Sequence, residues 1–434
     1  MPETPATRAD ARPPPAFLRL ASASAIGTTL EWYDFVVYNL MAALVFNRLF
    51  FPTFAPLTGT LLAFSTYAVG YLSRPAGGLL FGHLGDRYGR RFVLVTTLVV
   101  IGLATLLIGA LPTYASAGAL SPVLLVLLRF AQGAALGGEW AGAVLIALEH
   151  GPSGRRGWNG SFAQIGPACG TLLGTGVVAA LSVTLDPASF DAWGWRVPFF
   201  ASVALVAFGG WVRLRVQETP VFLALASREA RARAPVREVF TGHIRPLLLC
   251  IATRFGSDVC YAMLVVFTLT YLTTILQVER RTALLCTMLG AACHAIAIPV
   301  FAAWSDRAGR RPVAALGALL SIAWVFAYFP LLESRSPVLI ALAITLGLAL
   351  HAAMYGPQAA FIAEQFPARV RYAGSSLAYT LTGIIAGGIA PLIFTALYQR
   401  TLAAWPVSLY VAAALTVTVW AQWRVRETAF DGAL

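Results

Sequence analysis

The loop Gly82-His83-Leu84-Gly85-Asp86-Arg87-Tyr88-Gly89-Arg90-Arg91 decides the fold, because a weaker copy of it recurs later in the chain. The copy is Ser305-Asp306-Arg307-Ala308-Gly309-Arg310-Arg311, so that Asp306 follows Asp86 by 220 positions. Each copy directly follows a long apolar run. The two loops therefore mark equivalent places in two related halves.

Two further pairs of similar segments, called echoes here, appear in the same order in the two halves. Glu149, followed by Arg155-Arg156 and Gly160-Ser161, is matched by Glu364, followed by Arg369, Arg371 and Gly374-Ser375. The segment Arg215-Val216-Gln217-Glu218-Thr219 is matched by Arg424-Val425-Arg426-Glu427-Thr428. Three ordered echoes predict a parallel repeat, with a substrate site between the two repeats near the midplane of a membrane.

The composition agrees with a membrane protein, since 58% of the 434 residues are hydrophobic and only 12% are charged. A helix needs about 20 apolar residues to cross the hydrocarbon core of a bilayer. Runs of this length recur along the whole chain. The expected spans are 18–46, 57–82, 92–111, 121–150, 159–184, 195–216, 246–273, 280–303, 313–333, 336–364, 371–398 and 403–424.

We therefore expect an all-α membrane protein with twelve transmembrane helices in two pseudo-symmetric six-helix bundles. The expected divisions are a cytoplasmic tail 1–16, a first bundle 17–216, a cytoplasmic linker 217–245, a second bundle 246–424 and a short cytoplasmic tail 425–434. Rocking of one bundle against the other would expose a central site to each side in turn.

The net charge of +12 reflects topology. Lysine is absent, and 22 of the 31 basic residues lie in the loops that share a side with both termini, whereas six lie in the opposite loops and three lie within spans. The positive-inside rule places that side, and both termini, in the cytoplasm. The expected location is thus a bacterial inner membrane, with several passes through the bilayer and no nucleic-acid partner.

Other function classes lack their sequence signals. All five cysteines lie in apolar spans without the spacing of a disulfide framework or a metal site. The chain holds no GxSxG motif and no HExxH motif, so an enzyme is not expected. We expect no metal and no cofactor other than a proton as coupling ion, and the fold needs no second copy to complete its cavity, which favours a monomer.

The GxLxDRxGRR loop and its copy resemble the signature of the major facilitator superfamily, and the likeness covers nearly the whole chain. More specific motifs resemble the metabolite:proton symporter family within it. These are Glu31-Trp32-Tyr33-Asp34-Phe35, Arg74-Pro75, Arg129-Phe130-Ala131-Gln132-Gly133, Gly137-Gly138-Glu139-Trp140 and Trp193-Gly194-Trp195-Arg196-Val197-Pro198-Phe199.

This resemblance implies proton-coupled uptake of a small organic acid, such as shikimate, 2-oxoglutarate, a dicarboxylate or an aromatic carboxylate. A proton-coupled symporter for zwitterions such as proline or betaine is an alternative. A drug/proton antiporter stays open because Gly166-Pro167-Ala168-Cys169-Gly170 resembles part of an antiporter motif, although close helix packing is the favoured interpretation of these small residues.

Charged residues within spans need partners or a function, because burial in the membrane is costly. Four carboxylates (Glu31, Asp34, Glu139 and Asp258) face three arginines (Arg74, Arg129 and Arg254), which leaves one carboxylate in excess. A carboxylate without an arginine partner is a candidate to take up and release a proton. Asp34, Glu31, Arg129 and Glu139 are the proton-coupling candidates, with Asp34 set against Arg129 as in sugar-porter facilitators. A fixed structural ion pair is the competing interpretation.

The candidate substrate-binding residues lie in the same spans. Arg254 and Asp258 are four residues apart, with Tyr261 on the same helical face, and the guanidinium fork of Arg254 suits a carboxylate. His351, Tyr355 and Gln358 form a polar stripe at positions i, i+4 and i+7 that could hydrogen-bond a hydroxylated acid. Arg74 and Gln164 complete the set. Structural pairing and packing remain open for these residues.

The two repeated loops are interpreted as gating latches. Their aspartates can pair with nearby arginines or lie at a helix N-terminus, and their glycines permit tight turns. A role as topology signals alone is the alternative. The gating candidates are Gly82, Asp86, Arg87, Gly89, Arg90, Arg91, Asp306, Arg307, Gly309, Arg310 and Arg311.

Overall fold

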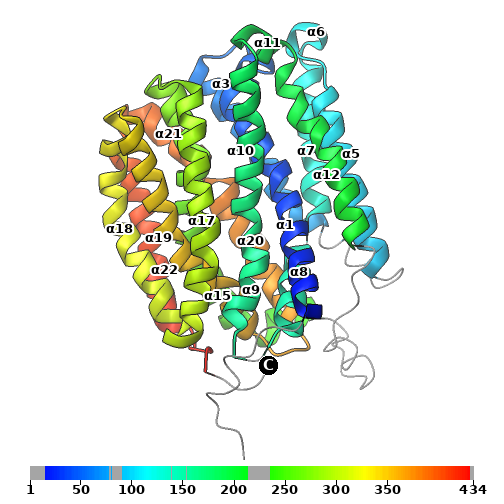
Figure 1. Ribbon diagram of the computed structural model, residues 1–434, viewed down its shortest axis with the longest axis vertical. Coiled ribbons are helices and arrows are strands. Elements are labelled where there is room, and N and C mark those ends of the chain that lie inside the picture. The colour runs from blue at the N-terminus through cyan, green and yellow to red at the C-terminus, as the bar shows by residue number, and fades with distance from the viewer. Residues whose placement is uncertain are drawn as a thin grey trace, which may run out of the picture.

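A computed structural model of the chain describes residues 15–77, 80, 90–137, 139–152, 154–213 and 235–430. Within these ranges the protein is built from helices, most of which run roughly parallel to the long axis of the molecule (Figure 1). The N-terminal half (residues 15–213) and the C-terminal half (residues 235–430) lie side by side, the latter drawn in colours that run from yellow-green to red (Figure 1).

The N-terminal half forms six successive helical spans. They begin with α1 (Pro15–Met41), which continues through η2 (Ala42–Phe46) and α2 (Asn47–Leu49), followed by α3 (Pro56–Leu72) and α5 (Arg90–Ala110). The fourth span joins α7 (Leu120–Ala135) to α8 (Glu139–His150), and the fifth joins α9 (Arg156–Gln164) to α10 (Gly166–Thr184). The sixth joins η3 (Gly194–Arg196) to α12 (Val197–Arg213), and the short helices α6 (Tyr114–Ala117) and α11 (Pro187–Ala192) lie between spans.

The C-terminal half repeats this order after a short helix α14 (Pro235–Gly242), which occupies the end of the expected linker. Its seventh span joins α15 (Ile244–Tyr261), η4 (Ala262–Phe267), α16 (Thr268–Thr270) and η5 (Tyr271–Ile275). Then follow α17 (Arg280–Ala308), α18 (Arg310–Glu333) and α19 (Pro337–Glu364). The eleventh span joins α20 (Arg371–Thr382), η6 (Gly383–Gly388) and α21 (Ala390–Thr401), and α22 (Trp405–Arg424) is the twelfth.

The predicted fold class of twelve helical spans in two related halves is confirmed. Seven of the helices in the described ranges are each long and apolar enough to cross a membrane without interruption. Several begin with proline in the first turn, for example Pro56, Pro337 and Pro406, where the missing N–H costs no hydrogen bond. Most predicted spans end within a few residues of those observed, whereas the predicted end of the second span at residue 82 lies outside the described residues.

Turns of π-helix interrupt spans 1, 7 and 11, and the sequence did not predict them. The turns that begin at Ala42 and Ala262 are 220 positions apart, which is the spacing of the two repeated loops. A π-turn shifts the register of the side chains that follow it and is frequent at functional sites. The turns η4 and η6 both contribute residues to the central cavity described below.

The halves meet along helix pairs that include α10 with α17, α9 with α19, α8 with α20 and α3 with η6. Within the N-terminal half, small residues bring α1 and α10 close together. A Cβ added to Gly166 would lie 2.3 Å from the Thr28 hydroxyl oxygen, and one added to Gly170 would lie 2.8 Å from the Trp32 Cβ. This packing role favours the interpretation of residues 166–170 as a close helix contact.

Candidate functional site

A cavity of about 650 Å³, counting the space open to solvent, lies between the two halves. The first half lines it with residues of α1 and α3 and the helical turn that follows α3. The second half lines it with residues of α15, α19 and α20 and the turns η4 and η6. The polar and aromatic lining residues are Trp32, Phe35, Asn39, Tyr67, Tyr71, Arg74, Arg254, Asp258, Tyr261, His351, Tyr355 and Tyr379. The position of the cavity matches the predicted site between two repeats.

Two guanidinium groups reach this cavity, one from each half. Arg74 lies over the rings of Tyr71 and Phe35, at 4.3 and 4.8 Å from their centroids. Arg254 lies over the ring of Tyr379 at 3.9 Å. Stacking on aromatic faces stabilises a guanidinium by about 2 kcal/mol or more when the group is desolvated, and it leaves the edge of the fork available for an anion.

Arg254 also forms a direct ion pair. Its Nε donates to the Asp258 Oδ2 at 2.7 Å along one face of α15, as the four-residue spacing predicted. The Nε of Arg74 has no hydrogen-bond partner among the described residues, and the buried carboxylate of Glu31 in α1 acts electrostatically on Arg74. The residues that line the cavity include the two arginines and the carboxylate of Asp258.

His351 lines the cavity, but both of its ring nitrogens already have protein partners. Nδ1 lies 3.0 Å from Nε2 of His294, and Nε2 lies 3.1 Å from the Ser257 hydroxyl oxygen. A hydrogen bond from His351 to a hydroxylated substrate would require one of these two partners to be replaced, and it stays a prediction. Tyr355 and Tyr261 line the cavity as predicted.

The two glutamines among the candidates do not line the cavity. Gln164 accepts a hydrogen bond from the Trp140 indole at 3.2 Å and donates to the Tyr355 carbonyl at 3.0 Å, so it joins the two halves behind the cavity wall. Gln358 is buried on α19, about one helical turn beyond Tyr355, and is not among the residues that line the cavity. The assignment of both glutamines to substrate contact stays a prediction.

The proton-coupling candidates lie deeper in the N-terminal half. Asp34 is almost fully buried and accepts a hydrogen bond from the Thr105 hydroxyl at 3.0 Å. Gln132 donates to the same hydroxyl at 2.7 Å and accepts from the Arg129 Nη1 at 2.5 Å. Two neutral side chains thus connect Asp34 and Arg129 by hydrogen bonds, the Arg129 charge acts on Asp34, and the coupling role of the two residues stays a prediction.

Aromatic rings surround Arg129, which has no exposed surface. Its guanidinium lies over the rings of Phe35, Tyr38 and Tyr67 at 4.1, 4.2 and 5.1 Å. Gly70 of α3 makes room for it, because an added Cβ there would lie 2.8 Å from the Arg129 Nε. Phe35 and Tyr67 also line the cavity, so they separate Arg129 from it by one layer of rings.

Two other proton-coupling candidates are less informative. Glu31 is buried in α1, one turn before Asp34. The side chain of Glu139 lies outside the described residues.

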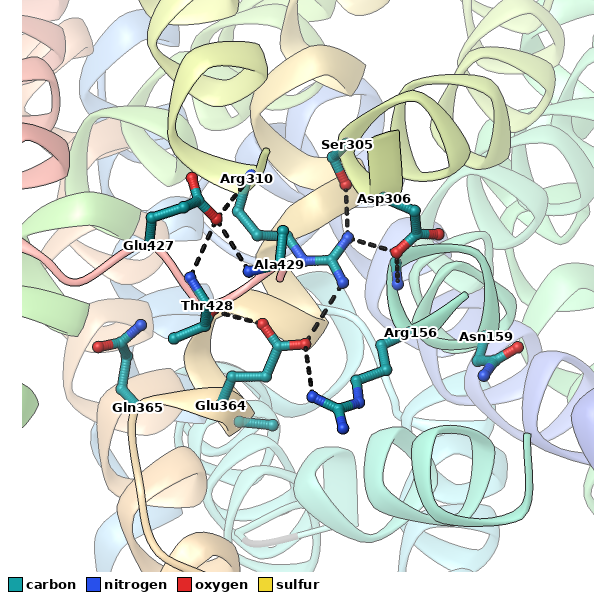
Figure 2. A network of polar contacts seen from close by, with 12 residues as sticks. Arg156, Asn159, Ser305, Asp306, Arg310, Glu364, Gln365, Glu427, Thr428 and Ala429 are labelled. Carbon is teal, nitrogen blue, oxygen red and sulfur yellow. Dashed lines mark hydrogen bonds and ion pairs between the residues drawn. The ribbon is translucent and has the colours of Figure 1, made fainter. Parts of the chain in front are cut away.

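The loop of residues 304–312 lies at one end of the molecule, called here the loop face. Asp306 accepts hydrogen bonds from the backbone N–H groups of Gly157 and Trp158 at 2.7 and 2.9 Å, at the start of α9 in the other half (Figure 2). It also pairs with Arg310 at 2.6 Å. The expected geometry, an aspartate at a helix N-terminus beside an arginine, is present.

Reciprocal ion pairs reinforce this contact between the halves. Arg156 of the N-terminal half lies 3.9 Å from Glu364, and Arg371 of the C-terminal half lies 3.9 Å from Glu149. Glu149 and Glu364 occupy equivalent positions in the two repeats, as do Arg156 and Arg371. Each glutamate therefore pairs with the arginine of the other half. Arg310 contacts the same Glu364 at 3.3 Å (Figure 2). We call Asp306, Arg310, Glu364, Arg156 and the start of α9 the latch.

The segment after α22 completes the latch. Glu427 accepts from the backbone N–H groups of Arg310 and Arg311 at 3.0 and 2.9 Å, which caps the start of α18. The Thr428 hydroxyl donates to Glu364 at 2.6 Å (Figure 2). The echo at 424–428 is thereby explained as a capping segment. Among the other gating candidates, Arg307 is exposed and Gly309 has a φ of 97°, a conformation that favours glycine.

Gly82, Asp86, Arg87 and Gly89 lie outside the described residues, as do the side chains of Arg90 and Arg91.

Sequence comparison extends this picture to known proteins. The profile of the "Sugar (and other) transporter" family matches residues 20–241 and again residues 234–432. The chain belongs to this family of the major facilitator superfamily. The double match follows the two halves seen in the structure.

Several relatives of this major facilitator protein align over most of its length. It is 36% identical to the inner membrane metabolite transport protein YhjE of Escherichia coli, over 94% of the chain and 93% of the relative. It is 37% identical to the shikimate transporter of Escherichia coli, over 92% of each. The proline/betaine transporter of Salmonella typhimurium is 34% identical over 89% of the chain and 77% of that protein. These relatives are transporters, as is this protein, and the prediction that it is no enzyme is confirmed.

Solved structures of other major facilitator proteins share the fold. The proton:xylose symporter XylE bound to 6-bromo-6-deoxy-D-glucose superimposes with a TM-score of 0.74, at 17% identity, over 95% of this chain and 96% of the other. A partially occluded inward-open form of XylE from Escherichia coli gives 0.75, at 18% identity, over 95% and 98%.

Sequence reasoning missed several residues around the major facilitator cavity. Tyr71 and Tyr379 support the two arginines, and His294 pairs with His351. Isolated aromatic residues in apolar helices look like packing residues. One usable signal was the position of Tyr71, three residues before Arg74 on the same helical face.

Proposed function

We propose that this transporter takes up a small organic acid together with a proton, across a bacterial inner membrane and with both termini in the cytoplasm. The observation that carries the proposal is that two guanidinium groups, Arg74 and Arg254, reach the cavity from opposite halves. Guanidinium groups on two sides of one cavity suit the carboxylate oxygens of an organic acid. The printed names of the relatives support a metabolite, and one of them is a shikimate transporter.

The proton path is proposed to run through Asp34. The Thr105 hydroxyl has one hydrogen, but it lies within reach of two acceptors, Asp34 Oδ2 at 3.0 Å and the Ile101 carbonyl at 2.9 Å. With Asp34 ionised, the hydroxyl donates to Asp34. With Asp34 protonated, Asp34 donates to Thr105, which turns to the Ile101 carbonyl. Gln132 would pass this change on to Arg129.

Alternating access is proposed to depend on the latch. The expected topology places the loop face in the cytoplasm, because most of the arginines lie in loops on that side. A closed latch would keep the cavity shut on the cytoplasmic side while substrate enters from the other side. Release would then require Asp306 to leave the start of α9.

A zwitterion symporter is the second candidate. The cavity offers a carboxylate, Asp258, as well as aromatic rings such as Trp32 and Tyr261, which can hold an ammonium group. Arg74 would bind the carboxylate of the same zwitterion. The proline/betaine relatives favour this candidate, and the two proposals differ in the net charge of the solute.

The test is uptake of radiolabelled shikimate, 2-oxoglutarate, citrate, protocatechuate, proline and glucose into membrane vesicles, with and without an inward proton gradient. Accumulation of an acid only with the gradient supports the first proposal, and accumulation of proline alone supports the second. If nothing accumulates and a cationic dye is extruded instead, both proposals are wrong and drug/proton antiport is favoured.

A further inference from the structure

A second group of titratable side chains, of which His351 lines the cavity and His294 is not among the lining residues, takes no part in the path through Asp34. His294 of α17 and His351 of α19 are both buried, and their rings lie 5.0 Å apart between centroids. The hydrogen bond between His351 Nδ1 and His294 Nε2 continues to Ser257 of α15 through His351 Nε2. Three helices of the C-terminal half thus share one chain of polar groups.

We propose that His294 and His351 form a proton-binding site of the C-terminal half, filled when an anion occupies the cavity. This inference rests on the proposed function, because it assumes an anionic solute. It adds a second place for a proton beside Asp34.

The pair can accept a proton without losing its geometry. Two neutral imidazoles carry two protons on four ring nitrogens, and one N–H already lies in the bond between the rings. A third proton makes His294 an imidazolium that donates through Nε2 to Nδ1 of His351. His351 then donates through Nε2 to the Ser257 hydroxyl oxygen. A hydronium ion in the cavity gives up the proton and becomes water, and the pair gains one positive charge.

The groups around His294 and His351 explain why protonation of this pair would depend on an anion in the cavity. The ionisable groups that face the pair are Arg254, Asp258 and Tyr261 of α15 and Tyr355 of α19. Arg254 is positive and is compensated by Asp258 at 2.7 Å. On the remaining sides the neighbours are apolar side chains of α10 and α17, such as Ala168 and Ile298, and Cys169 lies beside Thr29 of α1.

An anion bound between Arg74 and Arg254 would change this balance. It adds negative charge to a cavity that His351 lines, and in a medium of low dielectric constant such charges act strongly on each other. Anion binding and proton binding at the pair would therefore favour each other by linkage. That reciprocity is what a symporter needs.

The direct test reads the charge of each ring. The full chain, with [15N]histidine at its five histidines, is placed in lipid nanodiscs, and the imidazole signals are followed from about pH 5 to 8 with and without shikimate. Substitutions H294Q and H351Q assign the two signals. H243Q is the matched control, since His243 does not line the cavity.

We expect His294 and His351 to become protonated together in the presence of shikimate, at a pH where both are neutral without it. In H294Q the His351 signal should no longer respond. The site does not exist if both rings stay neutral with shikimate throughout this range, or if His351 responds identically in H294Q.

Transport provides the second readout. In H294Q, counterflow exchange should continue, and accumulation driven by a proton gradient should fall roughly tenfold. H243Q should behave as the wild type. Unchanged accumulation in H294Q would overturn a role of the pair in coupling. If the wild type itself shows no dependence on the gradient, the proposed proton coupling fails, and the histidine signals still decide whether the proton site exists.

Discussion

In the C-terminal half, Arg254 and Asp258 form a direct ion pair at 2.7 Å on a wall of the cavity. In the N-terminal half, Asp34 and Arg129 are held apart, and two neutral side chains join them. A closed ion pair needs little rearrangement and can face a substrate. The connection between Asp34 and Arg129 includes the Thr105 hydroxyl, which has two possible acceptors. This connection can therefore rearrange when Asp34 gains or loses one proton. The comparison suggests that the Arg254–Asp258 pair serves substrate binding, whereas the connection between Asp34 and Arg129 serves proton coupling.

The largest effect should follow Asp34→Asn. This substitution keeps the shape of the side chain and removes the exchangeable proton, so accumulation driven by a proton gradient should fall roughly 100-fold while counterflow exchange continues. Uptake and counterflow of the substrate identified by the vesicle panel measure both. Asp258→Asn is the matched comparison, and it should impair counterflow as well. If Asp34→Asn and Asp258→Asn lost accumulation and counterflow to the same extent, the two aspartates would not have separate roles.

The next effect concerns the ion pair itself. Arg254→Ala leaves a buried carboxylate without its partner, which costs about 3–5 kcal/mol and should lower the amount of folded protein. The double variant Arg254→Ala/Asp258→Ala removes both charges and should recover the folded yield, as measured by size-exclusion chromatography and thermal melting. If Arg254 holds the substrate, the double variant should still fail to exchange it. Restored exchange would mean that the pair is only structural.

Thr105→Val should produce a smaller change, about tenfold, in the dependence of uptake on the proton gradient. Valine has nearly the same shape but no hydroxyl, so Asp34 and Arg129 would lose their connection. Thr105→Ser restores the hydroxyl and should restore coupling. Rates measured across a pH series provide the comparison, and a Thr105→Val protein that couples as well as the serine variant contradicts the proposed connection.

The smallest effect is expected at the latch. Asp306→Asn weakens the contact with the start of α9, and the loop face should open about fivefold more often. The readout is the maleimide labelling rate of a single cysteine placed at Ala359, which is buried beside Gly160 of the other half. Arg307→Gln in the same loop is the control, because that arginine is exposed. If the cysteine in the Asp306→Asn protein is labelled at the same rate as in the Arg307→Gln control, the latch plays no part in gating.

The sequence predicted the helices well because each span is a long apolar run bounded by polar residues, and it predicted Arg254 with Asp258 because the pair lies on one helix. Contacts between helices were harder. Thr105 and Gln132 are neutral and lie far from Asp34 along the chain, so nothing in their spacing indicated that they separate Asp34 from Arg129. His294 is a single histidine in an apolar helix, and only the fold brings it to His351.

The π-turns show the same limit for local structure. Ala42–Phe46 and Ala262–Phe267 are ordinary apolar segments in sequence, and packing of the bundle selects the wider turn. In contrast, the sequence marked Glu427 as a repeated position, since its motif matches that at Glu218, although only the structure shows that Glu427 caps the start of α18.

The docking of Glu427 and Thr428 onto α18 and Glu364 also bears on biogenesis. Ribosomes deliver the chain from the N-terminus onward, so these two residues leave the exit tunnel only after all twelve spans have been made. Until then the start of α18 lacks its cap, and Glu364 lacks one of its partners. We therefore expect the loop face of the C-terminal half to reach its final arrangement only after the last span has been inserted.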